Sequence, residues 1–444
     1  MSGLDGLTMG GMALGLTVVL LVLRVHIGVA MLAGGALCYW MTNDGDLSSL
    51  LFTLDSLVYS RLSNYDLAVV PLFVLMGQFA THGGLSRAIF RCAAAFIGHI
   101  RGGVGISAIG ACAGFGAICG SSLATSATMS QVAMPELRNH QYPGALAGAT
   151  VAVGGTLGIL IPPSVPLIVY AVLTQESIAK LFMAAVVPGT IAVIGYMIVM
   201  WLQVMRLGIG QGDHIKPVPW RERLLALVSV IPIIGVFLVI IIGIYGGWAN
   251  PTEAAAIGAS ACGILAVLQG GMRWKGMQAC LLGTAETTAM IFLVLLGADL
   301  LNSGMALTQM PAELAVWVQD LSLPPLLVVG VILVLYVLLG CVMDSLAMLL
   351  LTIPIFFPVI MGLDIHGLDP TQKAIWFGIL ALMVVEIGLI TPPMGMNLFI
   401  VQRSAPDVPL MSMARQVFPF LVSDFIRVML LLFFPVLSLG LLHF

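Results

Sequence analysis

Residues 160–166 read LIPPSVP, so two adjacent prolines stand in the middle of a long apolar segment. Residues 390–396 read ITPPMGM and place a second proline pair in similar surroundings. A proline inside a helix removes one backbone donor and disrupts the helix at a cost of about 3 kcal/mol. In hydrocarbon, the backbone groups that lose their partners must be satisfied by the protein or by something that binds there. These two stretches therefore predict two membrane helices that break inside the bilayer.

The composition is that of a membrane protein. Of the 444 residues, 60% are hydrophobic and 8% are charged, whereas about a quarter of the residues in an average soluble domain are charged. Apolar stretches long enough to cross a hydrocarbon core of ~30 Å recur along the whole chain. We therefore expect an all-α polytopic protein in a lipid bilayer, with about ten to twelve membrane-inserted elements. The sequence has no basic patch that would indicate binding to nucleic acid, so we expect no nucleic-acid partner.

Charge placement predicts the topology. The first apolar segment is preceded by an acid rather than by the basic region of a secretory signal, so we expect a retained membrane helix. Residues 206–223 hold the densest group of basic residues and are predicted to lie in the cytoplasm. The segment that contains Arg87 and Arg91 forms either a helix lying at the interface or one packed on the bundle. The seven scattered cysteines predict unpaired thiols and no transition-metal site.

The two proline pairs belong to a longer internal repeat. When residues 158–168 are laid on residues 388–398, glycine meets glycine and both prolines meet prolines. Upstream of each pair lies a glycine-centred break, near residue 120 and near residue 340. We predict two inverted-topology repeats, each with a re-entrant helical hairpin and a Pro-Pro-broken helix. The first repeat covers 1–205 and breaks at 162–163, the second covers 224–444 and breaks at 392–393, and 206–223 is a cytoplasmic linker.

Broken helices in this arrangement are typical of secondary transporters. A helix that stops at a break turns the negative end of its dipole inward, which favours a cation, and its free carbonyls can coordinate a hard monovalent ion. A helix that restarts turns N–H groups inward, which favours an anionic group. Two such breaks in matching halves predict a substrate and coupling-ion site near the middle of the bilayer. The alternative is a pair of proline-kinked helices without a ligand.

At these residues the sequence resembles the large membrane subunit of tripartite ATP-independent periplasmic (TRAP) transporters, the DctM-like family of the ion-transporter superfamily. The resemblance runs from Val70 to Val401, which is most of the chain. The matching stretches are VPLFVLMGQFATHGG, IGHIRGG, AICGSSLATSAT, LGILIPPSVPLIVYAV, LFMAAVVPG, NPTEAAAIGA, GCVMDS and ITPPMGMNLFIV.

The resemblance implies an elevator-type transporter of the bacterial inner membrane, in which a transport domain slides against a scaffold domain. It further implies import of an organic anion driven by sodium rather than by ATP. A periplasmic binding protein would deliver the anion, and a small four-helix membrane subunit, on a separate chain, would stiffen the scaffold. The sequence contains no G-x-x-x-x-G-K-[ST] nucleotide-binding loop, in agreement with this expectation.

The resemblance also implies site residues, mostly acting through backbone carbonyls. One sodium site is expected around the first hairpin tip and first break, at Gly120, Ser121, Ser122, Gly158, Pro162 and Ser164. The other is expected around the second tip and second break, at Gly340, Met343, Gly388, Thr391 and Met394. The candidate substrate residues are Ser122, Thr125, Pro163, Asp344, Pro393, Asn397 and Arg403. No metal other than sodium is expected.

Several polar residues keep two interpretations. Asp344 either contributes charge to a site or caps the helix that follows it. Arg403 either grips a substrate carboxylate or anchors the chain at the interface. Asn397 is a candidate donor to a carboxylate. Glu286, Asp299 and Glu386 lie in apolar sequence, where an ionisable group is a functional hypothesis, with pairing inside the bundle as the alternative.

The same residues bear on two other possible functions. A stand-alone sodium/dicarboxylate symporter of the same superfamily would need no binding protein. An intramembrane enzyme could use Ser121 or Ser122, yet neither a suitably placed His or Lys base nor an H-E-x-x-H motif is present. The residues leave open which anion is carried, whether sugar acid, C4-dicarboxylate, sulfonate or 2-oxo acid.

Overall fold

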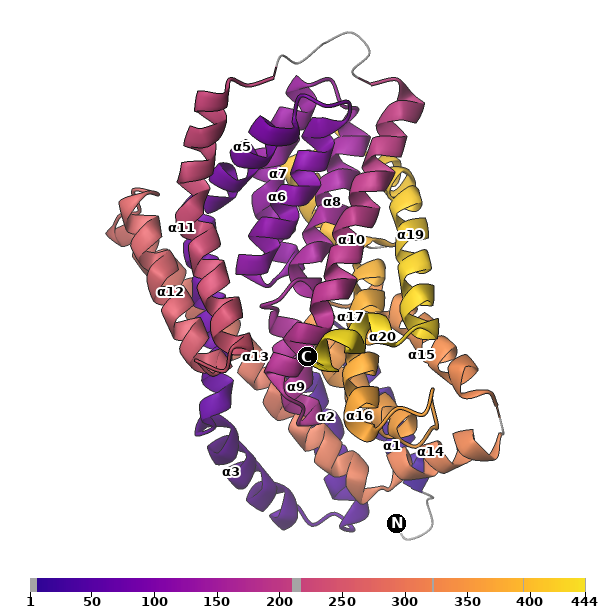
Figure 1. The fold of residues 1–444 in the computed structure, drawn as a ribbon. Helices are drawn as coiled ribbons and strands as arrows, with labels where there is room; N and C mark the ends of the chain where they lie inside the picture. The colour runs from indigo at the N-terminus through magenta and orange to yellow at the C-terminus, as the bar shows by residue number, and fades with distance from the viewer. Residues whose placement is uncertain (1–5, 210–216, 322, 394, 444) are drawn as a thin grey trace.

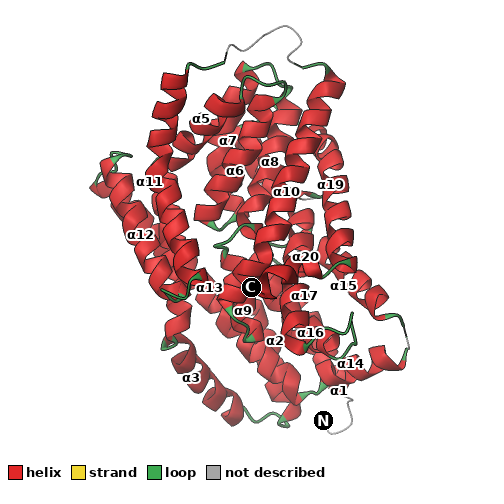
Figure 2. Cartoon of the chain, viewed as in Figure 1, coloured by secondary structure: helices red, strands yellow, loops and turns green. Residues whose placement is uncertain are grey.

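The computed structural model describes residues 6–209, 217–321, 323–393 and 395–443. Every regular element in these ranges is a helix (Figure 2). Seven described helices are long and apolar enough to cross a membrane, or eight if the bent pair Ser48–Leu62 and Tyr65–His82 counts as one span. Five shorter apolar helices of 10–17 residues accompany them. The expected all-α polytopic membrane fold is thus confirmed.

The chain up to residue 207 forms α1 (Gly6–Val22), α2 (Ile27–Thr42), α3 (Ser48–Leu62), η1 (Tyr65–Ala68), α4 (Val69–His82), α5 (Leu85–Ile97), α6 (Gly103–Cys119), α7 (Ser122–Asn139), α8 (Gly144–Leu160), α9 (Val165–Thr174) and α10 (Ile178–Leu207). The rest of the described chain forms α11 (Trp220–Tyr245), α12 (Pro251–Leu268), α13 (Trp274–Leu307), α14 (Met310–Asp320), α15 (Pro325–Gly340), α16 (Ser345–Met361), α17 (Pro370–Ile390), α18 (Met396–Ser404), α19 (Leu410–Phe433), α20 (Val436–Leu439) and η2 (Gly440–His443).

The boundaries of the predicted linker differ from the helix ends. Helix α10 continues to Leu207 and α11 already begins at Trp220, because residues 220–223 form the first turn of α11. The predicted linker 206–223 therefore overlaps both helices, and its residues 210–216 lie outside the described part of the chain. Helix α5 packs against α6 and α11 with Arg87 and Arg91 exposed, which supports the bundle-packed alternative for that segment.

Helices α2 and α13 form a close seam through glycines. A methyl group at Gly28 or at Gly35 would lie 2.8 Å or 2.7 Å from backbone atoms of α13. On the other side of the seam, a methyl group at Gly297 would lie 2.5 Å from a backbone oxygen of α2. Small residues let membrane helices approach to backbone contact. The seam makes α2 and α13 one stiff unit. Helix α1 packs on α2, α4 packs on α13, and α12 packs on α4, so these three helices extend the unit.

Two ion pairs join helices that are distant in sequence. Arg61 at the end of α3 pairs with Asp299 of α13 through two hydrogen bonds, one of them 2.6 Å from Nη2 to Oδ1. This contact shows that Asp299 is paired inside the bundle. Arg138 of α7 donates to Asp407 over 3.0 Å, beyond the end of α18. That hydrogen bond lowers the pKa of the exposed Asp407 carboxyl.

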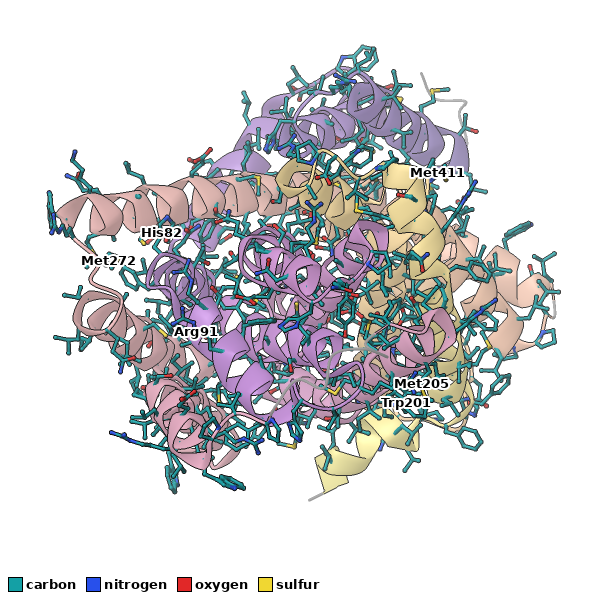
Figure 3. The ribbon with its side chains drawn as sticks, turned by 90° about the horizontal axis from the view of Figure 1, so that it is seen from above. His82, Arg91, Trp201, Met205, Met272 and Met411 are labelled. Atoms are coloured by element: carbon teal, nitrogen blue, oxygen red, sulfur yellow. The ribbon has the colours of Figure 1, made fainter. Side chains whose placement is uncertain are left out.

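The centre of the molecule is formed by the helices that precede the proline pairs. In α17, 94% of the 18-residue apolar stretch is buried inside the protein. The buried share of the corresponding stretch is 83% in Gly144–Thr174 and 17% in α11. Helix α8 is built almost wholly of small and apolar residues, which suits a helix surrounded by protein. At the rim, Trp201 and Met205 of α10 are exposed (Figure 3), as expected of a surface that faces lipid.

The two helical hairpins enter this centre from opposite ends. In Figure 1, α6 and α7 lie in the upper part of the molecule, toward the end of α10 and the start of α11. Helices α15 and α16 lie in the lower part, toward the start of the chain. Each hairpin packs on the long helix of its own half, α6 and α7 on α8, and α15 and α16 on α17.

Both hairpins meet their central helix at a glycine pair. A methyl group at Gly388 of α17 would lie 2.6 Å from Cα of Gly340, and one at Gly116 of α6 would lie 2.6 Å from Cα of Gly158. The first-half counterpart of Gly340 in this contact is therefore Gly116. Gly120, which we had matched with Gly340, is the left-handed cap of α6 at φ 64°.

The glycine pair in the second half predicts a stability effect. We expect Gly388→Ala to destabilise the protein by about 1–3 kcal/mol, because its methyl group would overlap backbone atoms that cannot rotate away. Gly330→Ala, in α15, is the control, because nothing lies within 4 Å of the new methyl group. That change should stabilise the helix by about 0.5–1 kcal/mol. Thermal unfolding in detergent measures both, and equal stability of the two variants would contradict the packing.

Candidate ion and substrate site at two helix breaks

The first break is in direct contact with the first hairpin tip. Helix α8 ends at Leu160, the Pro162–Pro163 bond is cis, and α9 restarts after Ser164. The backbone N–H of Val165 donates to the Gly120 carbonyl over 3.3 Å. Because a methyl group at Gly120 would lie 3.0 Å from the Pro163 carbonyl oxygen, only a glycine fits this turn comfortably.

Three buried hydroxyl groups lie on α7, the helix that leaves the first hairpin tip. Ser122, Thr125 and Ser126 are buried, and their hydroxyl oxygens have no nitrogen or oxygen hydrogen-bond partner among the described residues, although the Cys119 thiol lies near the Thr125 hydroxyl. A methyl group at Gly158 would lie 2.7 Å from Oγ1 of Thr125, and one at Gly155 would lie 1.8 Å from Oγ of Ser126. The hydroxyls therefore crowd the last turns of α8. Buried polar atoms are nearly always paired, so a cluster of unpaired ones points to a ligand.

Ser121 and Ser164 are used by the local backbone. Ser121 is the N-cap of α7, and its hydroxyl accepts from the backbone N–H of Ala124 over 3.4 Å. Ser164 precedes α9, and its hydroxyl donates to the Ile159 carbonyl over 2.5 Å. That contact takes up one carbonyl of the last turn of α8. Of the predicted first sodium site, Ser122 thus keeps a free side-chain oxygen, as does its neighbour Thr125, a predicted substrate residue.

The second break repeats the helix end and the cis proline bond of the first, with other side chains and with a restart after left-handed Gly395 instead of extended Ser164. Helix α17 ends at Ile390, the Pro392–Pro393 bond is cis, and α18 restarts after Gly395. Thr391 donates its hydroxyl to the Ile387 carbonyl of its own helix. Cys341, just beyond the tip glycine Gly340, lies with its Sγ 3.7 Å from the Pro392 carbonyl oxygen. Met394, which we assigned to this site, lies outside the described residues.

Asp344 caps the helix that leaves the second tip. Its carboxylate accepts from the backbone N–H of Leu346 over 3.2 Å, as an N-cap does. The capping interpretation is therefore confirmed. The carboxylate, half-buried like Met343 beside it, also brings negative charge to the tip.

Asn397 and Arg403 are placed differently from expectation. The side-chain N–H of buried Asn397 donates to the Ala152 carbonyl of α8 over 3.2 Å, whereas its oxygen Oδ1 has no partner among the described residues. The free atom is an acceptor, which suits a cation and not a carboxylate. Arg403 is exposed in the last turn of α18, about 12 Å along the helix from the break. Neither side chain offers a free donor at the breaks.

A buried charge network lies behind the breaks, and we had identified only one of its members. Arg427 of α19 places Nη2 3.2 Å from Oε2 of Glu386 and 2.9 Å from Oδ1 of Asp424. Tyr196 of α10 donates to Oδ2 of Asp424 over 2.9 Å, and its hydroxyl lies 3.4 Å from that of Thr156 in α8. The pattern Asp-x-x-Arg inside apolar α19 is the signal that could have revealed it.

The arrangement can bind hard monovalent ions better than transition metals. Among the described residues, no group of three or more His, Cys, Asp or Glu side chains could hold a metal ion. Glu286 is exposed on α13 and joins no cluster. The groups near the breaks are backbone carbonyls at the ends of α6, α8, α15 and α17, together with the hydroxyls of α7 at the first break. The restarting ends of α7, α9, α16 and α18 bring N–H groups to the same places.

Known proteins are similar to this chain over most of its length. Residues 14–437 match the family model described as tripartite ATP-independent periplasmic transporter, DctM component. The C4-dicarboxylate TRAP transporter large permease protein DctM of Pseudomonas aeruginosa is 35% identical over 89% of this chain and 92% of its own length. The sialic acid TRAP transporter large permease protein SiaM of Vibrio cholerae is 33% identical over 85% of this chain and 86% of its own.

Solved structures show the same fold at low identity. The Alcanivorax borkumensis YdaH transporter superposes with a TM-score of 0.61 at 15% identity, over 87% of this chain and 88% of that one. Neisseria gonorrhoeae MtrF superposes with a TM-score of 0.52 at 12% identity, over 95% and 94%. Both are membrane transporters. With a family model and two relatives that cover most of its length, this chain belongs to the large permease subunits, or DctM components, of tripartite ATP-independent periplasmic transporters.

Proposed function

We propose that this permease imports an organic anion by secondary active transport coupled to sodium. A periplasmic binding protein delivers the anion, and a small four-helix membrane subunit completes the complex in the inner membrane. The observation that carries the proposal is the set of buried, unpaired hydroxyls on α7, at Ser122, Thr125 and Ser126, of which the last two lie against the last turns of α8. Hydroxyl and carbonyl oxygens are the ligands that hard cations prefer.

The substrate class follows from the relatives. The relatives include TRAP permeases named for C4-dicarboxylate, sialic acid, 2,3-diketo-L-gulonate and isethionate, and all of these are organic acids. An anion of this kind is attracted by the N-terminal ends of α7, α9, α16 and α18, which start at the tips and breaks. Family membership also favours a tripartite system over the stand-alone symporter.

For an elevator mechanism we propose two bodies. One body is the seam of α2 and α13 with its neighbours, and the other contains the hairpins, the broken helices, α10 and α19. A cleft of about 450 Å³ lies between them, with Arg61, Asp66 and Pro251 on one side and Glu176 and Ser177 on the other. We infer that the second body slides along the first and carries the site across the membrane.

The energy supply is sufficient for uphill import. Moving one charge through 100 mV releases about 2.3 kcal/mol. Two sodium ions with a monoanion move one net charge inward on each cycle. A dianion needs at least three sodium ions to keep the cycle electrogenic.

Ion and partner replacement tests the coupling. In proteoliposomes that contain both membrane subunits, an inward sodium gradient and the binding protein should give uptake of the radiolabelled anion. Potassium in place of sodium should abolish that uptake, because the larger ion does not fit oxygens set for sodium. Equal uptake in potassium would refute sodium coupling. Uptake that persists without the binding protein would instead favour the stand-alone symporter.

The hydroxyl of Thr125 can be removed to test the ion site without a loss of stability. We expect Thr125→Val to raise the sodium concentration for half-maximal uptake by about five- to tenfold, since one oxygen ligand is worth about 1–1.5 kcal/mol. The variant should unfold at the same or a higher temperature, because the hydroxyl it removes is buried and unpaired. Thr190→Val is the control. Thr190 is an exposed residue of α10, and its hydroxyl donates to the Val186 carbonyl over 2.8 Å. Unchanged sodium dependence in Thr125→Val would exclude this hydroxyl from the site.

A further inference from the structure

The buried network of Glu386, Asp424 and Arg427 is not balanced in charge. Two carboxylates face one guanidinium, so its formal charge is -1, and the three side chains are 0%, 1% and 2% exposed. Among the described residues, Arg427 is the only cationic side chain within 4.0 Å of either carboxylate. A lone negative charge in a protein interior is costly unless another charge compensates it.

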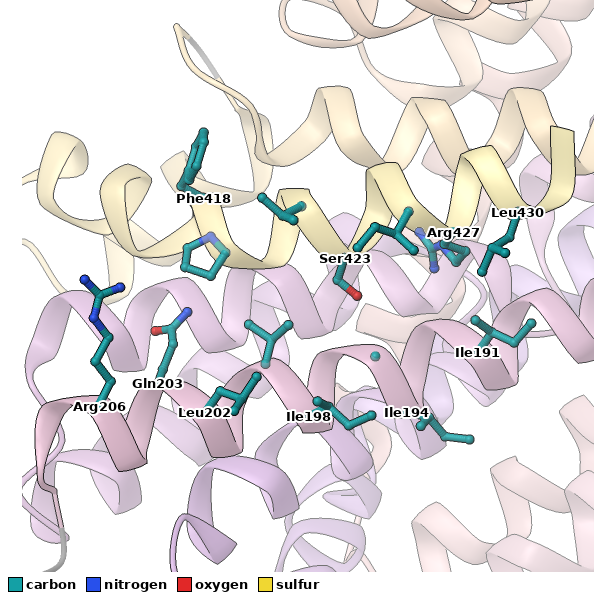
Figure 4. Close-up of a pocket in the computed structure, with 15 residues that line it drawn as sticks. Ile191, Ile194, Ile198, Leu202, Gln203, Arg206, Phe418, Ser423, Arg427 and Leu430 are labelled. Carbon is teal, nitrogen blue, oxygen red and sulfur yellow. The ribbon is translucent and has the colours of Figure 1, made fainter. Parts of the chain in front are cut away.

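The network lies beside a groove whose lining is mostly apolar. This groove of about 720 Å³ runs between α10 and α19, with Arg427 and Ser423 on its wall (Figure 4). Most of its other lining is aliphatic, including Ile191, Ile194 and Ile198. In such a medium charges interact over longer distances than in water. The excess charge must therefore be compensated by a proton on one carboxylate, by another charge of the protein or by a bound cation.

The network lies directly behind the second break. Glu386 is two residues before Gly388, so the two point to nearly opposite sides of α17, Glu386 toward α19 and Gly388 toward the second hairpin tip. From Glu386 to Thr391, where the helix has ended, the distance along the axis is about 7.5 Å. At this separation the carboxylate cannot coordinate an ion held at the break, but its field reaches that ion.

The same register in the first half carries no charge. Thr156 is two residues before Gly158, as Glu386 is before Gly388, and it meets the network only through the hydroxyl of Tyr196. The network therefore joins the two central helices at matching places. It brings a carboxylate to α17 and a neutral hydroxyl to α8.

We propose that Glu386, with Asp424 held by Arg427, supplies the negative charge that balances a sodium ion bound at the break of α17. These residues act through the field and through the position of α17, and they are positioning residues rather than ligands. The inference rests on the sodium coupling proposed above. It predicts that the sodium dependence of transport changes with the charge of the network.

Charge-neutralising variants test the proposal. Glu386→Gln keeps an acceptor for Arg427 and removes the net charge, so the sodium concentration for half-maximal uptake should rise about tenfold. Asp424→Asn keeps an acceptor for Tyr196 and should cause a rise in the same direction, which covers the case in which the first variant does not fold. Glu286→Gln, which neutralises an exposed glutamate of α13, is the matched control and should leave the sodium dependence unchanged.

The readout separates charge from mere structure. A structural role would lower the maximal rate or the unfolding temperature and leave half-saturation by sodium unchanged. Sodium-dependent wild-type uptake with unchanged half-saturation in both variants would overturn this inference alone. Wild-type uptake that needs no sodium would overturn the proposed coupling itself, and with it the inference.

Discussion

The structure depends on one constraint, that hydrocarbon offers no partner to an unpaired backbone group. Each proline pair leaves unpaired groups where one helix stops and another starts, and the fold answers by burying these places at its centre. A hairpin tip is pressed against each break, and a glycine on each side allows the contact, Gly116 with Gly158 and Gly340 with Gly388. These contacts between tip and helix bury the breaks but leave some oxygens without partners, and those oxygens define the candidate site.

Both breaks have a cis proline pair just after a helix end, but their side chains differ. At the first, three unpaired hydroxyls from α7 supply neutral oxygens next to α8. At the second, the nearest threonine bonds to its own helix, and the charge comes from Asp344 at the tip and from the network behind α17. A repeat that began with two equal halves would bind two equal ions. The halves as they stand favour one site built on neutral ligands and one supported by charge.

The sequence predicted those parts of the site whose signals are local in the chain. A proline acts on its own helix, so both breaks and the capping role of Asp344 were predictable. Gly116 was not singled out, because three glycines stand close together before the tip and only the packing selects one. Arg427 and Asp424 were missed because their partner Glu386 is 41 residues away on another helix. Asn397 was expected to donate to a substrate, but its amide is taken by α8, a contact between halves that no local pattern reveals.

The charge count links the network to the transport cycle. A buried ion triad is a poor source of stability compared with apolar residues of similar volume, so its presence behind a break needs another explanation. In the proposed cycle with two sodium ions and a monoanion, the network and these ligands sum to zero, so the network offsets the net charge of the bound ligands. In the empty state the network contributes a formal charge of -1, to which the Asp344 carboxylate at the second tip adds. A membrane potential that is negative inside drives this charge outward, so the proposed network would increase the effect of the potential on the return of the empty carrier.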